Sequence, residues 1–167
     1  MFGNVAGYCL NTSTIQSCGL SLQEKIELAA RVGYDAIELW VDDIETYLKG
    51  AGTLPQLRTI LNENAIKVPN LIAFFEWAIP HAPQREKALE EAVPVFQIAK
   101  ALACPYVAAA PAGITDKEDI PLEDIAGYYQ DLLEATHEIN VKPVLEFWGH
   151  SKTLGSLKEA MEVLRIL

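Results

Sequence analysis

Five apolar segments of the chain lack the polar alternation of a sheet that has one solvent-exposed face. Such runs are typical of strands covered on both faces, as in parallel sheets. The expected strands span Val5–Leu10, Ala36–Trp40, Val68–Phe75, Tyr106–Ala110 and Lys142–Phe147. They follow one another at intervals of about thirty residues, the length of one strand–helix repeat.

Helical segments with polar start signals separate these strands. Ser21 and Glu24 form a capping box, in which each side chain accepts a hydrogen bond from a free backbone N–H. Thr53 and Ser156 give comparable start signals, and Gly33 stands where the first helix should end. The pattern therefore predicts a helix after each of these three start signals.

Two longer helices are expected in the second half of the chain. One runs from about Gln84 to Leu102 and the other from about Pro121 to Glu138. Pro94 should kink or divide the first of them, because proline removes an intrahelical hydrogen-bond donor.

The alternation of strands and helices indicates an α/β protein with a parallel sheet. A doubly wound open sheet and a (β/α)8 TIM-type barrel both satisfy it. The chain contains neither GxGxxG nor GxxxxGK[ST], the phosphate-binding turns that would favour the open sheet. We therefore favour the barrel.

The length of the chain conflicts with a complete barrel, which needs about 250 residues. The 167 residues should hold about the first five strand–helix units, as a single domain (1–167) that is incomplete at its C-terminal end. Such a chain is either a fragment or an incomplete barrel that buries an open sheet edge against a partner. Homo-oligomerisation is one way to do so.

Composition narrows the classes of partner. The formal net charge is -10, which disfavours nucleic acid, because affinity for phosphates rests mainly on Lys and Arg. A small-molecule substrate and metal ions are the expected partners. The three cysteines are odd in number and contain no CxxC spacing, so the sequence indicates neither a disulfide framework nor a zinc knuckle.

Cellular location is also an expectation from the sequence. The first residues do not resemble a signal peptide. No apolar stretch reaches the roughly 18 to 20 residues that a membrane span needs. We expect a soluble cytoplasmic protein that does not interact with membranes.

Glu146 is the strongest candidate for chemistry, because it lies near the end of an apolar strand. The carboxyl ends of strands carry the functional site in parallel α/β folds. A lone carboxylate there costs several kcal/mol unless it is paired or binds a metal. A buried ion pair is the alternative to a ligand or catalytic role. His150 follows four residues later, and either contacts substrate or lies on the surface.

Further candidates lie on the earlier strands. Glu38 occupies a similar place in the second strand, where it is either functional or a structural anchor that accepts hydrogen bonds from neighbouring strands. Asn11 ends the first strand. Phe75 and Trp77 belong to the segment Phe74–Trp77, which could form the apolar wall of a sugar site or could be ordinary packing.

Three segments together resemble a known family. They are Val144–His150 followed by Thr153 and Leu154, the segment Arg31–Trp40, and Cys104–Val107. They are similar to the fifth strand and helix, the first helix and second strand, and the fourth strand of the xylose-isomerase-like sugar isomerase/epimerase family. The resemblance covers essentially the whole chain, and it implies the (β/α)8 barrel.

The resemblance also implies a cofactor and a chemistry. The family binds a divalent metal ion, commonly manganese, magnesium, cobalt or zinc, through ligands on strands five to eight. Only the strand-five carboxylate has a counterpart here, Glu146, which would be metal ligand and candidate base. The other ligands would lie beyond Leu167.

The implied reaction is isomerisation or epimerisation of a keto sugar or inosose through an enediolate, a reaction of carbohydrate metabolism. His150, Glu38 and the Phe74–Trp77 wall would orient this substrate.

Two alternatives stay open. An endonuclease-IV-like DNA repair enzyme needs several histidines and a basic DNA-binding face, whereas this chain has three histidines and an acidic balance. A non-catalytic partial barrel that serves as a binding module is the other.

Overall fold

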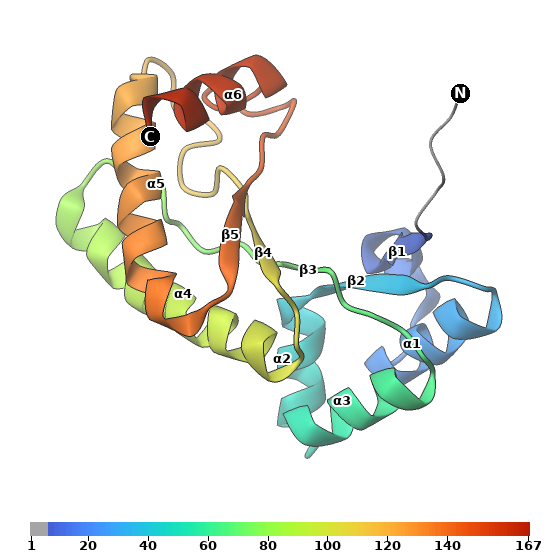
Figure 1. The fold of residues 1–167 in the computed structure, drawn as a ribbon. Helices are drawn as coiled ribbons and strands as arrows, with labels where there is room; N and C mark the ends of the chain where they lie inside the picture. Colours follow the sequence, from blue (N-terminus) through green and yellow to red (C-terminus); the bar gives the residue numbers. More distant parts are fainter. Residues whose placement is uncertain (1–6) are drawn as a thin grey trace. The chain divides into compact units, whose positions relative to one another are not determined.

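The computed structural model describes residues 7–167, along which strands and helices alternate (Figure 1). The strands are β1 (Cys9–Asn11), β2 (Ala36–Trp40), β3 (Asn70–Ile72), β4 (Tyr106–Ala109) and β5 (Lys142–Leu145). The α-helices are α1 (Leu22–Arg31), α2 (Val41–Lys49), α3 (Leu54–Glu63), α4 (Ala82–Ala101), α5 (Leu122–Thr136) and α6 (Leu157–Ile166). The 3-10 helices are η1 (Thr12–Cys18) and η2 (His137–Ile139). No helix in the described range is long and apolar enough to cross a membrane.

The expected α/β pattern is confirmed, with five parallel strands at the expected places. Several strands are shorter than the apolar runs that predicted them. The run expected at Val68–Phe75 forms hydrogen-bonded strand only at β3. Val5 and Ala6, expected in the first strand, lie outside the described residues. The apolar runs extend past the strands, and these extensions contain both buried residues, such as Ala73 and Ala110, and exposed ones, such as Phe74 and Phe147.

The chain forms two compact units, and each is described by itself. The first contains residues 7–72 and 98–105, and the second contains residues 73–97 and 106–167. In the first unit, β1 pairs with β2 and β2 pairs with β3, all in parallel. The register places Leu10 opposite Ile37 and Leu39 opposite Leu71, and all four are buried. Because side chains alternate across a strand, these residues form one buried face.

The opposite face of this small sheet is partly polar. The same register aligns Asn11 with Glu38 in neighbouring strands, and Asn70 lies two residues before Ile72, the partner of Trp40. Asn11, Glu38 and Asn70 therefore lie in one row across three strands.

In the second unit, β4 and β5 pair in parallel over four residues. Val107, Ala109 and Pro143 are buried and share one face. The Tyr129 hydroxyl of α5 donates a hydrogen bond to the Pro143 carbonyl at 2.9 Å, which ties the helix to β5.

The capping predictions agree with the structure. The Ser21 side chain accepts from the Glu24 N–H and the Glu24 carboxylate accepts from the Ser21 N–H, so the capping box is complete. Thr53 and Ser156 also cap α3 and α6, because their side chains accept from the N–H groups of Gln56 and Glu159 respectively. Pro94 lies inside α4, which continues as one helix of 20 residues and is not divided.

Three helices end in the same turn. Gly33, Ala65 and Ala103 follow α1, α3 and α4, and each adopts a positive φ of 90°, 54° and 57° respectively. In each turn the next residue donates its N–H to a carbonyl five residues back, as in Ile66 to Leu61 at 3.0 Å. This is the Schellman motif, which satisfies carbonyls left free at a helix end.

Candidate functional site

Glu38 holds the polar row of the first unit together. One carboxylate oxygen accepts from the Asn11 side-chain amide at 2.8 Å, and the other accepts from the Asn70 amide at 2.6 Å. A carboxylate that bridges two amides on flanking strands is a strong acceptor, because charge-assisted hydrogen bonds are shorter and stronger than neutral ones. These contacts match the structural anchor that the sequence left open for Glu38.

Asn70 was not among the residues predicted from the sequence. Its Oδ1 atom is buried and has no hydrogen-bond partner among the described residues. The Oδ1 of Asn11, in contrast, accepts from the Ser13 N–H at 2.9 Å and from the Trp40 indole at 3.4 Å. A signal existed in the sequence: Asn70 lies in an apolar segment, where an unpaired amide is costly and a carboxylate on the next strand is a natural partner.

The surroundings of Glu38 also affect the pKa of the neighbouring Cys9 thiol. Burial raises the pKa of the Cys9 thiol, and the negative charge of Glu38 raises it further. Both effects oppose formation of the thiolate, which is the nucleophilic form of a cysteine.

Glu146 directly follows β5 in the second unit. Its backbone N–H donates to the Ala109 carbonyl at 3.0 Å, which continues the ladder between β4 and β5 by one residue. The side-chain alternation of β5 therefore puts Glu146 on the face of Val144, opposite the buried face that contains Pro143. The residue is half-buried.

Aromatic side chains surround the loop that follows Glu146. The Trp148 ring stacks on the His150 ring with centroids 5.3 Å apart, and it meets Phe74 edge-on at 5.5 Å. Phe75 packs against Phe96 at 5.9 Å. The His150 imidazole is exposed, and it lies flat against the Trp148 ring.

Trp77 lies in the packed interior of the second unit. It has no exposed surface, its indole N–H donates to the Ala110 carbonyl at 2.6 Å, and its ring meets Tyr129 edge-on. Of the two interpretations that the sequence left open for Trp77, this burial favours packing.

The β5–α6 loop is joined to the β4–α5 loop by several hydrogen bonds. The Lys152 N–H donates to the Thr115 carbonyl at 2.9 Å, and the Thr153 hydroxyl donates to the Lys117 carbonyl at 2.8 Å. Within the loop, the Trp148 N–H donates to the carbonyl of Leu154, a fully buried residue with a positive φ of 59°. These hydrogen bonds tie the loop that carries Trp148 and His150 to the β4–α5 loop and to its own C-terminal part.

The predicted site residues fall into two sets. Asn11 and Glu38 are in contact in the first unit, whereas Phe75, Trp77, Glu146 and His150 belong to the second. Among residues 7–167, no group of three or more His, Cys, Asp or Glu is arranged to hold a metal ion. The described residues therefore do not fit a complete metal site, although Glu146 could supply one oxygen ligand.

Most of the chain matches a known protein family. Residues 26–167 match the family described as xylose isomerase-like TIM barrel. The chain belongs to this family. The resemblance predicted from the segments around Glu38 and Glu146 is thereby confirmed, and so is the barrel type of fold.

The chain is also similar to individual proteins. The chain is 29% identical over 161 residues to an inosose isomerase of Halalkalibacterium halodurans, covering 93% of this chain and 56% of that protein. It is 25% identical to the solved structure of the IOLI protein, which has a bound zinc atom, with a TM-score of 0.81 over 95% of this chain and 58% of that one. D-psicose 3-epimerase from Clostridium cellulolyticum H10, solved with D-tagatose, shares the fold at 14% identity, with a TM-score of 0.77 over 96% of this chain and 59% of that one. The chain thus spans little more than half the length of these relatives.

Proposed function

We propose that this chain carries part of the catalytic site of a metal-dependent isomerase or epimerase that acts on a keto sugar or an inosose. Membership of the xylose isomerase-like family supports the reaction class. The position of Glu146 carries the proposal: a half-buried carboxylate at the carboxyl end of β5, on the face opposite the packed one. Carboxyl ends of strands are where barrels of this type hold reacting groups.

Glu146 would act on the proton next to the substrate carbonyl. A carboxylate within reach of that carbon can remove its proton and leave an enediolate. Return of the proton to the adjacent carbon, with the hydroxyl proton passing to the former carbonyl oxygen, gives the isomer. Protonation of the first carbon on its other face, by a second acid, gives the epimer. The same carboxylate would be one ligand of a divalent cation such as Mn²⁺, Mg²⁺, Co²⁺ or Zn²⁺, all of which accept oxygen donors.

The aromatic group beside Glu146 would orient the substrate. The imidazole of His150 is held by its stack on Trp148 and remains exposed, so a ring nitrogen can bond a substrate hydroxyl. Phe74, with 45% of its surface exposed, offers an apolar surface to the C–H face of a sugar. Phe75 would support this wall from behind, through Phe96. We assign Glu38 and Asn11 a structural role within the first unit, because both Glu38 oxygens already accept amide donors.

The experiment measures proton exchange directly. Inososes and keto sugars are incubated with the protein in D₂O, and deuterium at the carbon next to the carbonyl is followed by NMR. Exchange should occur in the presence of at least one of the four metal ions and should stop when a chelator is added. Glu146→Gln should abolish exchange, whereas Glu138→Gln, which removes an exposed carboxylate after α5, should not.

Two results would contradict the proposal. A folded wild-type protein that incorporates no deuterium with any of the four ions does not perform this reaction. Exchange that survives in Glu146→Gln would assign the base to another residue.

A further inference from the structure

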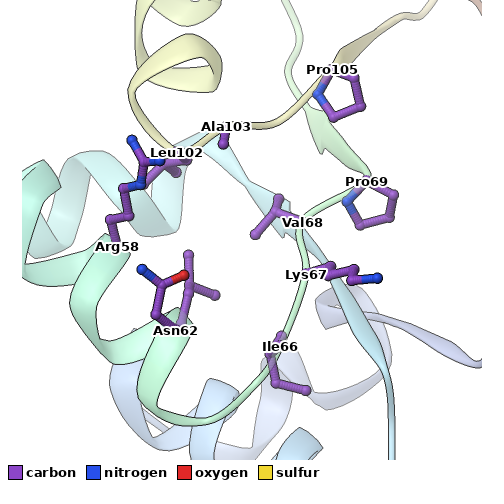
Figure 2. Close-up of a pocket in the computed structure, with 10 residues that line it drawn as sticks. Arg58, Asn62, Ile66, Lys67, Val68, Pro69, Leu102, Ala103 and Pro105 are labelled. Atoms are coloured by element: carbon purple, nitrogen blue, oxygen red, sulfur yellow. The ribbon is translucent and has the colours of Figure 1, made fainter.

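A cavity lies in the first unit, between α3, the segment that leads into β3 and the turn that follows α4. Its volume is about 360 Å³. The segment that leads into β3 and the turn that follows α4 form its apolar walls, with Ile66, Val68, Pro69, Leu102 and Pro105. Figure 2 shows Arg58 and Asn62 of α3 on one side of the cavity and Val68 facing them from the other.

The size and lining of the cavity suit the body of a small organic molecule. Ligand pockets in proteins usually have volumes of about 300–1,000 Å³ and mainly apolar walls with a few polar groups. Here Arg58 and Asn62 are the side chains with hydrogen-bonding groups that face the cavity, and they lie one helical turn apart on α3. Lys67 contributes to the lining, but Figure 2 shows its amino group pointing away from Arg58.

Arg58 has unused capacity for an anion. Of its five N–H donors, one makes a long hydrogen bond of 3.4 Å to the Ala101 carbonyl. It forms no ion pair with any carboxylate in the described part of the chain. The chain has 23 acidic residues and 13 basic ones, yet the cavity lining contains two basic residues and no acidic one.

The C-terminal end of α4 opposes the binding of an anion beside Arg58. α4 ends beside Arg58, and the end of a helix carries roughly half a negative charge on its free carbonyls. The guanidinium carries a full positive charge, so the local balance remains positive. A planar guanidinium also matches a carboxylate with two parallel hydrogen bonds.

We propose that this cavity binds a monocarboxylate with an apolar body, its carboxylate on Arg58 and Asn62 and its body against Val68 and Leu102. The site is separate from Glu146 and does not depend on the proposed isomerase reaction. A compound with one carboxylate and a flat apolar ring system is a suitable probe.

The test uses 2-naphthoate and its uncharged counterpart 2-naphthamide, titrated into the ¹⁵N-labelled full chain and followed by two-dimensional NMR. We expect 2-naphthoate to shift the backbone amides of Ile66, Lys67 and Ala103. Arg58→Gln should weaken 2-naphthoate binding about tenfold, the loss of one charged hydrogen-bonding contact, and should not change 2-naphthamide binding. Lys49→Gln makes the same change of charge on α2, outside the cavity lining, and should leave both probes unaffected.

A second variant tests the cavity independently of charge. Asn62→Phe places an aromatic ring in the cavity from an exposed position of α3, and should abolish binding of both probes. The proposal is overturned if millimolar 2-naphthoate shifts no amide around the cavity, if its shifts map elsewhere, or if Arg58→Gln and Lys49→Gln bind it equally well.

Discussion

Glu38 satisfies two amide donors at once, and its replacement should show how much that arrangement contributes to stability. Glu38→Ala leaves the amides of Asn11 and Asn70 without their acceptor, and we expect a loss of about 2–3 kcal/mol in the free energy of unfolding. Glu38→Gln should cost about half of that. Asn70 can turn its amide and offer Oδ1 to the new NH₂ group, because that oxygen has no partner among the described residues.

Urea unfolding of both variants measures these losses. A cost below about 0.5 kcal/mol for Glu38→Ala, the range of ordinary surface substitutions, would rule out the anchor role. Equal costs for the two variants would show that Asn70 does not turn.

Tyr129 makes stability depend on pH in the alkaline range. Burial raises the pKa of Tyr129 to about 12, from an ordinary value of 10.0. Between these values the unfolded chain loses the proton and the folded protein keeps it, so the free energy of unfolding should fall as pH rises from about 10 to 12. A shift of this size corresponds to about 2–3 kcal/mol.

Tyr129→Phe supplies the control. It should lower stability at neutral pH, because the hydrogen bond to the Pro143 carbonyl is lost, and it should flatten the decline above pH 10. An unchanged slope in this variant would place the titration on another residue, such as Tyr128, whose pKa burial also raises.

Sequence reasoning reached some residues of the site and missed others. Glu38 could be recognised as a candidate residue, because a carboxylate in an apolar strand needs a hydrogen-bonding or charged partner. The identity of its partners could not be predicted, because it depends on how the neighbouring strands are aligned. Asn70 was missed because its amide is uncharged, so a single such residue inside the apolar run Val68–Phe75 is a weaker signal than a carboxylate. From the sequence alone, Trp77 could line a sugar site or belong to the packed core. Only its contacts with Tyr129 and Ala110 in the structure show that it is buried.

At the scale of elements, the β5–α6 loop depends on a glycine that permits close backbone approach. A Cβ atom on Gly155 would overlap the carbonyl oxygen of Ser151, whereas one on Gly149 would meet no atom within 4 Å. Gly155→Ala should therefore cost about 1–3 kcal/mol and displace Trp148 from His150, while Gly149→Ala should be neutral. Thermal unfolding and the ring-current shifts of His150 report the two effects. Equal behaviour of the two variants would mean that the loop adapts freely.

The shared turn after α1, α3 and α4 gives a matched pair of substitutions. Gly33 has a positive φ and open space around its Cα, so Gly33→Ala tests the backbone conformation alone and should cost about 1–2 kcal/mol. Ala65 already bears that strain, and Ala65→Gly should be neutral or stabilising by up to about 1 kcal/mol. Denaturant midpoints measure both changes, and a stabilised Gly33→Ala variant would contradict the argument.

Helices with polar start signals were predictable, and those without such signals were not. α2 follows β2 directly, and its N-cap residue, Trp40, makes no capping hydrogen bond through its side chain in the described structure. The sequence thus gives no mark where strand changes to helix. η1 lies in a polar segment without apolar periodicity. Pro94 lacks a backbone N–H, yet α4 continues through it as one helix.

For the whole molecule, the expectation of one domain over residues 1–167 has a direct consequence for unfolding. A single cooperative domain loses all its structure in one transition, and different probes then report the same midpoint. The described residues form two compact units in space. Comparing the unfolding midpoints of probes in the two units therefore tests whether they unfold together. Coincident midpoints would confirm the single domain, and separated midpoints would show two.

The three tryptophans provide those probes without any substitution. Trp40 lies in the first unit, whereas Trp77 and Trp148 lie in the second, one fully buried and the other stacked on His150. Three such different surroundings should give 5-fluorotryptophan-labelled protein three resolved ¹⁹F resonances. A single urea titration can then follow each unit, and the loop beside Glu146, by its own spectroscopic signal.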